Sequence, residues 1–333
     1  MILYKERKSY KMKKFWMILL LFCAFVQIQP AEAKDLKFVQ ITDTNFTLDI
    51  DDTASEETAA QFRKAVKDIN KDRSIKFVVF TGNSVRHPDK KEVAAFFKLA
   101  NKLNKPYYVV IGNKEVLRYK HFTKKNFMHI AWLHNSDMRF KKPSYVFKPN
   151  KDIVVVVLDG VNEMMPVPSG NYRPETLEWL DKQLQKYKKK KVVIVQHFPV
   201  VSPSDNPMYN AADLHKYLQT INTYDNVIAV VSGHFNADVT TYKKGVYHIN
   251  SPAFRAPYYK YKIIDINYEP EYLFSTPSEF IITQKVINMV EPKDEQVLPD
   301  ESEQKTELTD VKNTNTENGT EQTQENIPAQ EQK

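Results

Sequence analysis

Residues 36–43, LKFVQITD, form a short apolar run that stops at a carboxylate. Four runs of the same kind follow it: IKFVVFTGN (75–83), YYVVIGN (107–113), VVIVQH (192–197) and VIAVVSGH (227–234). Short runs rich in Val, Ile and Phe are typical of buried strands in an α/β sheet, and ligands of such sheets bind where the strands end. The residues at the five ends are Asp43, Asn83, Asn113, His197 and His234. Their oxygen and imidazole donors suit a metal ion, so the sequence predicts a metal site at these ends.

The segments around these runs predict helices and further strands. Apolar residues recur at helical spacing in four segments, 55–71, 90–103, 175–187 and 210–221. Further strands are expected at 144–147 and 153–158, and then at 238–242, 246–249, 259–266 and 279–290, which follow one another without a helix. The alternation predicts a largely parallel sheet to which the last strands add antiparallel pairs. The expected fold class is α/β, with two mixed β-sheets packed face to face and flanked by helices.

The first 33 residues differ in character from the centre of the chain. Six Lys or Arg residues lead into a largely apolar stretch, 15–28 (FWMILLLFCAFVQI), and the sequence Ala31-Glu32-Ala33 follows. This order is typical of a secretory signal peptide, so we expect an exported protein, secreted or held in the cell envelope. The stretch is shorter than the ~20 residues that span a bilayer, although an uncleaved membrane anchor is the alternative. The single cysteine, Cys23, lies here, so no disulfide or thiolate site is expected in residues 34–333.

The last 43 residues, 291–333, have no aromatic residue and hold twelve acidic residues against four lysines. This composition predicts a disordered tail. The net charge of the whole chain is +7, and because residues 1–33 carry +4 and the tail carries −8, residues 34–290 carry +11. We expect those residues to form one large domain whose basic surface favours anionic ligands. The Lys-rich segment 186–191 is interpreted as a solvated helix end, and the chain shows no clear nucleic-acid motif.

The residues at the strand ends resemble the motifs of the calcineurin-like metallophosphoesterases, a family that includes purple acid phosphatases, nucleotidases and phosphodiesterases. The family carries, in order, D-x-H, G-D-x-x, G-N-H-[DE], a lone His and G-H-x-H. The corresponding blocks here are Asp43-Thr44-Asn45, Gly82-Asn83-Ser84-Val85, Gly112-Asn113-Lys114-Glu115, His197 and Gly233-His234-Phe235-Asn236. The resemblance covers about 36–266 and implies a four-layer αββα sandwich. It also implies two divalent metals that share an Asp bridge and a hydroxide that attacks phosphorus.

Four positions depart from the family's pattern. Asn45 and Asn236 stand where the family has His, Asn83 stands where it has the bridging Asp, and Lys114 replaces the His of G-N-H-[DE]. Asp43 is then the only anionic ligand left to balance two divalent ions. The ammonium group of Lys114 repels a cation but attracts a phosphate. We therefore expect one ion (Mn, Fe or Zn) rather than two, or none.

The candidate metal ligands are Asp43, Asn45, Asn83, Asn113, His197, His234 and Asn236, and the candidate catalytic residue is Lys114. The first hypothesis is an exported family member that has largely lost its dinuclear site, is inactive or weakly active, and binds a phosphorylated small molecule, another anion or a partner. The alternative is a working phosphomonoesterase or phosphodiesterase with one metal held by Asn113, His197 and His234. A purely structural envelope protein has less support. Asp159, which ends the strand at 153–158, is interpreted as a turn residue rather than a substitute ligand.

Overall fold

The computed structural model describes residues 35–48, 53–118, 121–164, 167–204, 209–212, 214–268 and 280–290. All of these belong to one unit of the chain, Met1–Glu291. The predicted signal peptide (1–33) and acidic tail (291–333) lie outside the described residues. Within those ranges, none of the helices has the length and apolarity that a membrane span requires.

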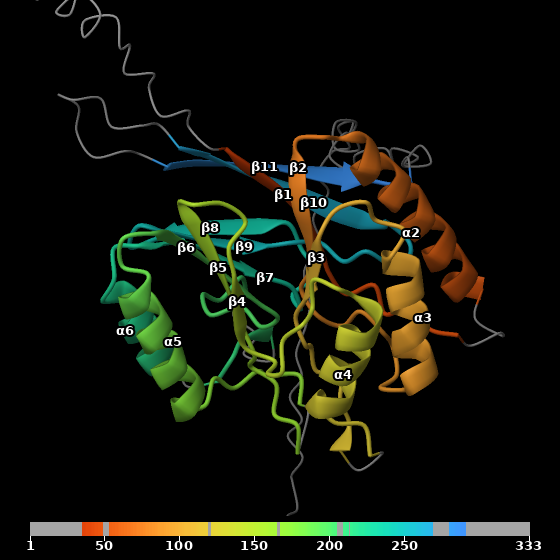
Figure 1. Cartoon of the computed structure of the whole chain (residues 1–333), viewed down its shortest axis with the longest axis horizontal. Coiled ribbons are helices and arrows are strands. Elements are labelled where there is room, and N and C mark those ends of the chain that lie inside the picture. The colour runs from red at the N-terminus through yellow and green to blue at the C-terminus, as the bar shows by residue number, and fades with distance from the viewer. Residues whose placement is uncertain are drawn as a thin grey trace, which may run out of the picture. The chain divides into compact units, whose positions relative to one another are not determined.

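Two mixed β-sheets form the centre of the fold (Figure 1). The first sheet has the order β11-β10-β1-β2-β3, with β1 (Leu36–Ile41), β2 (Ile75–Phe80), β3 (Tyr107–Val109), β10 (Lys260–Tyr268) and β11 (Phe280–Asn288). The second has the order β4-β5-β6-β7-β9-β8, with β4 (Tyr145–Phe147), β5 (Ile153–Leu158), β6 (Lys191–Gln196), β7 (Val227–Ser232), β8 (Val239–Lys243) and β9 (Val246–Asn250). Strands β1, β2 and β3 are parallel, as are β5, β6, β7 and β9, whereas β4, β8, β10 and β11 pair antiparallel. The predicted fold class is therefore confirmed.

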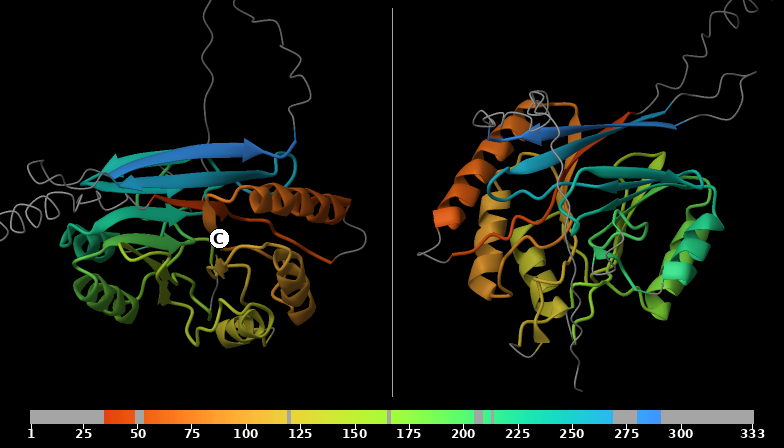
Figure 2. Two further views of the ribbon diagram at one scale, coloured as in Figure 1. Left: turned by 45° about the horizontal axis from the view of Figure 1, so that its top comes forward. Right: turned by 180° about the vertical axis from the view of Figure 1, so that it is seen from behind.

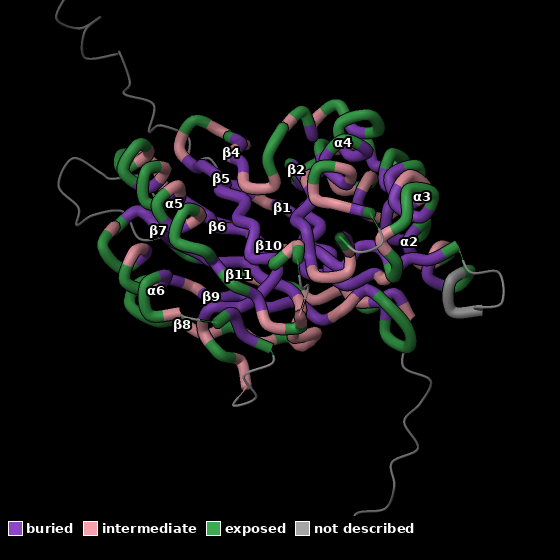
Figure 3. The backbone as a smooth tube through the Cα atoms, turned by 90° about the horizontal axis from the view of Figure 1, so that it is seen from below, coloured by how far each residue is buried: buried purple, intermediate pink, exposed green. Residues whose placement is uncertain are grey.

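Helices flank both sheets. They are α2 (Thr53–Lys71), α3 (Lys90–Ala100), α4 (Lys124–His134), α5 (Pro174–Lys186) and α6 (Leu214–Asn222). Figures 1 and 2 show α2, α3 and α4 beside the first sheet and α5 and α6 beside the second. Most strands lie in the buried interior, whereas the edge strands β8 and β11 are largely accessible to solvent and the outer sides of the helices are exposed (Figure 3). Burial of the amphipathic faces, such as Val93, Phe96, Phe97 and Ala100 of α3, fixes the helices on the sheets.

Polar contacts between the two sheets hold their strand ends together. The side-chain amide of Gln40 in β1 donates to the carbonyl of Ser232 in β7 over 2.8 Å. The fully buried ammonium group of Lys262 in β10 donates to the carbonyl of Asn250 in β9 over 2.6 Å and pairs with Asp238 at 2.6 Å. Buried polar groups are stable only when they are paired, so these contacts fix how one sheet sits on the other.

Several details differ from the sequence prediction, and four of them affect the topology or the loops near the site. Helix α4 was not predicted, although its capping box, in which Thr123 and Asn126 bond to each other's backbone N–H, is visible in the sequence. Helix α6 begins four residues later than expected because Ala211 and Ala212 donate to the loop carbonyls of Pro199 and Gly170. Strand β3 ends at Val109, two residues early. Strand β9 pairs parallel with β7, because β8 forms a hairpin with β9 and is antiparallel to it.

Candidate functional site

Loops at the carboxyl ends of β1, β2, β3, β6 and β7 meet at one place. The backbone N–H of Asp43 donates to Gly82 (3.0 Å), that of Asn45 to Asn83 (2.9 Å), and that of Gly233 to His197 (3.0 Å). These bonds are made by the backbone alone, and they join neighbouring strand ends without any contribution from side chains. The sequence-predicted residues therefore lie together because the parallel strands bring their ends to one edge.

Glycines allow the loops to come this close. A Cβ atom at Gly233 would lie 2.0 Å from Thr42 Oγ1 and 3.1 Å from Asp43 Oδ2. At Gly82, where φ is +91°, a Cβ would lie 2.5 Å from His197 Nδ1. Any larger residue at either position would push the polar side chains apart.

The Asp43 carboxylate is buried and accepts three hydrogen bonds. Its Oδ2 accepts from the hydroxyl of Thr42 (2.7 Å) and from the backbone N–H of His234 (3.0 Å). Its Oδ1 accepts from the side-chain amide of Asn83 (3.0 Å). Only 2% of Asp43 is exposed. Hydrogen-bond donors of the protein thus surround this negative charge.

The orientation of the Asn83 amide is fixed by its second neighbour. The backbone N–H of Lys114 lies 3.0 Å from Asn83 Oδ1 and can only donate, so that atom must be the amide oxygen. The NH₂ group then necessarily faces Asp43. An ionised carboxylate at position 83 could not donate this hydrogen bond, because its oxygen and that of Asp43 are both acceptors.

Lys114 is half-buried and reaches across the site. Its ammonium group donates to Asn45 Oδ1 over 2.7 Å, and the Asn45 NH₂ donates to the carbonyl of Asp43 over 2.9 Å. Burial and the nearby guanidinium group of Arg255 lower the pKa of Lys114, whereas the carboxylates of Asp43 and Glu115 raise it. Asp43, Asn45, Asn83 and Lys114 thus form one continuous network, which we call the Asp43 half of the site.

His197 and Asn113 belong to the other half. His197 Nδ1 lies 2.7 Å from the carbonyl oxygen of Thr81, which only accepts, so Nδ1 carries the proton. Its Nε2 lies 3.2 Å from Asn113 Oδ1. Burial lowers the pKa of His197 to about 4, although the carboxylate of Asp43 opposes this. In the neutral ring Nε2 is an acceptor, so two acceptors face each other unless the amide turns or a cation lies between them.

His234 completes this second group, which we call the His197 half. Its ring centroid lies 4.9 Å from that of His197 and 4.9 Å from that of Phe198. Asn236, two residues further on, has a buried Oδ1 atom that has no hydrogen-bond partner among the described residues. Of the predicted ligands, Asn236 is thus the one that the side-chain contacts leave outside both halves.

Glu115 joins two of the loops that carry the site. Its fully buried carboxylate accepts from the backbone N–H groups of Gly112 (2.7 Å), Asn83 (2.9 Å), Val85 (3.4 Å) and Ser84. Burial raises the pKa of Glu115 to about 7, and the four N–H groups act against this shift. One side chain therefore ties the loop after β2 to the loop after β3.

Several residues at the strand ends have left-handed backbone conformations. The φ angle is +53° at Asp43, +44° at Asn45, +51° at Asn83, +66° at His234 and +63° at Asn236. Asn, Asp and His tolerate this region better than other residues with a side chain. The loops therefore turn sharply enough to aim their side chains inward.

Asp159 does not join the site. It forms an ion pair with Lys124, and its Oδ1 accepts from the backbone N–H of Val161 over 3.1 Å. These contacts agree with the turn role expected from the sequence.

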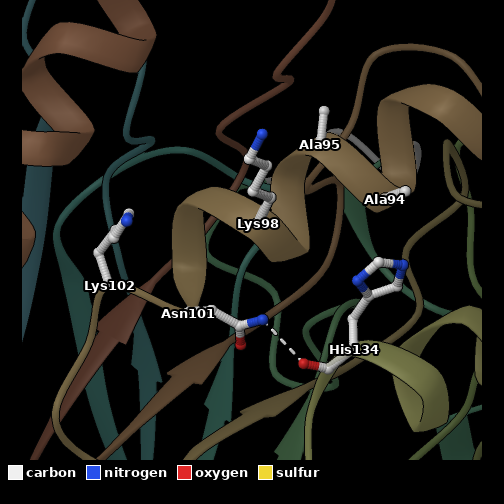
Figure 4. Close-up of a pocket in the computed structure, with 6 residues that line it drawn as sticks. All are labelled: Ala94, Ala95, Lys98, Asn101, Lys102 and His134. Carbon is white, nitrogen blue, oxygen red and sulfur yellow. Dashed lines mark hydrogen bonds between the residues drawn. The ribbon is translucent and has the colours of Figure 1, made fainter.

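A separate groove of about 410 Å³ lies between α3 and α4 (Figure 4). It is lined by Ala94, Ala95, Lys98, Asn101, Lys102 and His134, and the Asn101 amide donates to the carbonyl of His134 over 2.8 Å. None of the residues that line it comes from the motif blocks. This groove is therefore distinct from the candidate site.

Comparisons with known proteins give relatives with phosphodiesterase names. One from Arcobacter nitrofigilis, named "Probable glycerophosphodiester phosphodiesterase GpdQ", is 24% identical over 168 residues, or 49% of this chain and 58% of that protein. The chain thus matches little more than half of that relative's length. A "Probable cyclic nucleotide phosphodiesterase" from Colwellia psychrerythraea is 22% identical over 222 residues, or 65% of this chain and 77% of that protein.

Solved structures share the fold. A dimetal phosphatase from Danio rerio superposes with a TM-score of 0.57 at 16% identity, covering 77% of this chain and 99% of that chain. The family described as calcineurin-like phosphoesterase matches residues 36–237, from the start of β1 to just past the G-H-x-H block. This match spans more than half of the chain, and the chain belongs to the calcineurin-like phosphoesterase family.

Proposed function

We propose that this protein binds a phosphate-type anion at the strand ends and does not carry out dinuclear hydrolysis. Members of its family typically act through divalent metals. The observation that supports a different function here is the hydrogen bond from the Asn83 amide to Asp43. It places a neutral donor where the family's motif has a carboxylate that bridges two ions.

The Asp43 half fits a metal ion poorly. Three donors already occupy the Asp43 carboxylate, and the Asn45 oxygen is taken up by the Lys114 ammonium group. Within the described residues, no group of three or more His, Cys, Asp or Glu side chains is arranged to hold a metal ion. A cation entering this half would have to break these bonds and lie beside a positive charge, which is costly at short range.

The second candidate function is hydrolysis of a phosphoester with one divalent ion, and the facing acceptors of the His197 half favour it. Asn113 Oδ1 and His197 Nε2 lie 3.2 Å apart, a contact that a shared cation would turn from repulsive to attractive. His234 lies beside His197 and would supply a further imidazole donor. When bound, such an ion would polarise a phosphoryl oxygen and acidify a water molecule.

Metal analysis of the purified protein separates the two functions. We expect less than one Mn, Fe or Zn per chain, and no hydrolysis of p-nitrophenyl phosphate or bis(p-nitrophenyl) phosphate above the buffer rate. A stoichiometric metal that is lost in His197→Ala and His234→Ala, together with hydrolysis, would instead establish the one-metal enzyme. Glu163→Gln, in the loop after β5, is a control that changes a loop carboxylate outside the motif blocks.

We further propose that the protein acts outside the cytoplasm. The signal-like residues 1–33 support this proposal, and their removal can be tested by sequencing the N-terminus of the protein recovered from culture medium and from envelope fractions. A mature N-terminus near Lys34 supports cleavage and release, whereas an intact leader in the membrane fraction supports the anchor.

A further inference from the structure

We propose that a cavity between α6 and the hairpin of β8 and β9 is a second binding site, which takes a small hydroxylated anion such as a sugar phosphate. The cavity, which we call the α6 cavity, has a volume of about 490 Å³, a size that suits a small molecule. The polar side chains that line it include His215, Gln219, Asn222, Lys243, Lys244 and His248. None of these residues belongs to the motif blocks, so this inference is independent of the proposed function.

The α6 cavity lies away from the candidate site. Strands β8 and β9 form one edge of the second sheet, and α6 lies beside their hairpin (Figure 1). Strand β9 begins at Val246 and runs parallel to β7, so the hairpin turn lies at the amino ends of these two strands. The candidate site is built on carboxyl ends, at the opposite edge. A ligand in the α6 cavity therefore does not compete with an anion at the candidate site.

The hairpin places two lysines at the rim of this cavity. Lys244 and Gly245 have φ angles of +50° and +80°, and they connect the paired residues Lys243 and Val246. A two-residue turn with two positive φ angles matches the twist of the strands it joins, so the backbone of both lysines is held in place. Neither ammonium group has an acidic partner among the described residues, and none of the residues that line the cavity is acidic. The cavity thus presents two positive charges that an anion would balance.

His248 is the one buried residue among those that line the cavity. The strand register sets Thr241 opposite His248 and Lys243 opposite Val246, and because side chains alternate along a strand, His248 and Lys243 share one face of the hairpin. Only 5% of His248 is exposed, and its buried Nδ1 atom has no hydrogen-bond partner among the described residues. Burial lowers the pKa of His248 to about 4, and the ammonium group of Lys243 acts in the same direction. The ring is therefore neutral at pH 7, and a buried polar atom without a partner is costly until a ligand group pairs with it.

Helix α6 supplies polar groups from the facing wall. His215, Gln219 and Asn222 follow one another at spacings of four and three residues, which puts them on one face of the helix. Tyr217 and Ile221 are buried on the other face. Side-chain amides donate and accept hydrogen bonds, as the hydroxyl groups of a sugar do. A metal ion, which the neutral imidazoles alone would suit, is repelled by the two ammonium groups, so the combination fits an anion that also carries hydroxyl groups.

Titration calorimetry on the full-length protein, stripped of metals with a chelator, tests the α6 cavity with glucose 6-phosphate as the probe. The proposed function gives one binding site that depends on Lys114, and the cavity gives a second that does not. In Lys114→Gln we therefore expect one molecule of glucose 6-phosphate still to bind per chain. Adding Lys243→Gln with Lys244→Gln to this variant should weaken the remaining binding about tenfold or more, and adding His248→Gln instead should weaken it about threefold. Adding Lys98→Gln, which removes an exposed lysine of the groove between α3 and α4, should leave it unchanged.

The outcomes distinguish this inference from the proposed function. If Lys114→Gln binds no glucose 6-phosphate while the natural protein binds one molecule, the second site is overturned and the proposed function stands. Binding in Lys114→Gln that the two hairpin substitutions leave unchanged also overturns it, as does glucose that binds as tightly as glucose 6-phosphate. If the natural protein binds one molecule that is lost with the two hairpin lysines and kept in Lys114→Gln, the second site is supported and the proposed function fails. Circular dichroism confirms that each variant is folded.

Discussion

The two halves of the candidate site, built on the ends of neighbouring strands, are completed in different ways. In the Asp43 half, each side-chain contact joins a donor to an acceptor, and the network includes both a carboxylate and an ammonium group. In the His197 half, an imidazole nitrogen faces an amide oxygen. The first half is satisfied by its own hydrogen bonds, whereas in the second the two acceptors are relieved either by a turn of the Asn113 amide or by a cation. The same scaffold thus satisfies the polar groups of the Asp43 half by hydrogen bonds and presents acceptors that suit an ion in the adjacent His197 half.

The largest effect is expected when the Asp43 half is converted to the family's motif. Asn45→His, Asn83→Asp, Lys114→His and Asn236→His together would supply a bridging carboxylate and three imidazoles, one of which replaces the ammonium group of Lys114. We expect metal content to rise to about two ions and hydrolysis of bis(p-nitrophenyl) phosphate to rise on the order of 100-fold or more. Adding His197→Ala to this variant should abolish the gain. If the quadruple variant binds two metals but does not hydrolyse the substrate, these four positions do not by themselves explain the proposed lack of hydrolysis in the natural protein.

The second largest effect is expected on the free energy of unfolding at acid pH, through His197. In the folded protein the pKa of His197 is about 4, whereas its ordinary value is 6.5. Between these two pH values the His197 side chain is protonated in the unfolded chain and neutral in the folded protein. The free energy of unfolding should therefore fall as the pH drops from 6.5 to 4, by roughly 3 kcal/mol from this group. His197→Gln should remove that part of the slope in urea unfolding measured at several pH values.

His248 provides a matched control for this prediction. It lies in β9 outside the site, and burial lowers its pKa to about 4 as well. His248→Gln should flatten the pH profile to a similar extent. Under the second candidate function, in which this half holds a metal ion, manganese should steepen the loss in acid only in proteins that retain His197, and an equal effect in His197→Gln would contradict that function. Glu115 acts in the opposite direction, since its raised pKa of about 7 makes its contribution fall as the pH rises from 4.5 to 7.

A smaller effect is expected from Asn83→Asp alone. The new carboxylate would replace the NH₂ group that lies 3.0 Å from Asp43 Oδ1, so two like charges would meet in a buried place. We expect the metal-free protein to lose about 2 kcal/mol of unfolding free energy. The double variant Asp43→Asn with Asn83→Asp, which keeps one carboxylate and one amide, should recover much of the loss. Full stability in the single variant would show that the pair shares a proton without cost.

The smallest effect concerns the contact between Asn45 and Lys114. Asn45→Gly keeps the φ of +44° accessible but removes two hydrogen bonds, and we expect a loss of about 1 kcal/mol in thermal or urea unfolding. Asn236→Gly is the comparison, because the Oδ1 atom it removes has no partner. Equal losses in the two variants would mean that the bond to Lys114 adds nothing to stability.

The strands and the site's location could be predicted from the sequence because buried runs and their terminal residues are local signals. All five strands are present where the pattern predicted them, although β3 ends two residues early. The side-chain contacts could not be predicted. The direction of the Asn83 amide depends on the backbone N–H of Lys114, which lies 31 residues away in sequence. The position of Arg255 beside this site likewise depends on one backbone bond between Phe254 and Thr42.

The left-handed backbone angles bear on which residues the loops of the site can accept. Three of the four departures from the family's motif, at positions 45, 83 and 236, are asparagine, and each has a positive φ. Asparagine tolerates this conformation as readily as Asp or His, so the backbone of these loops can accept any of the three residues. The fourth departure, Lys114, is not among the residues with positive φ. Backbone conformation thus limits which residues these loops can accept, and it permits side chains of different chemistry at the same position without a change of the backbone.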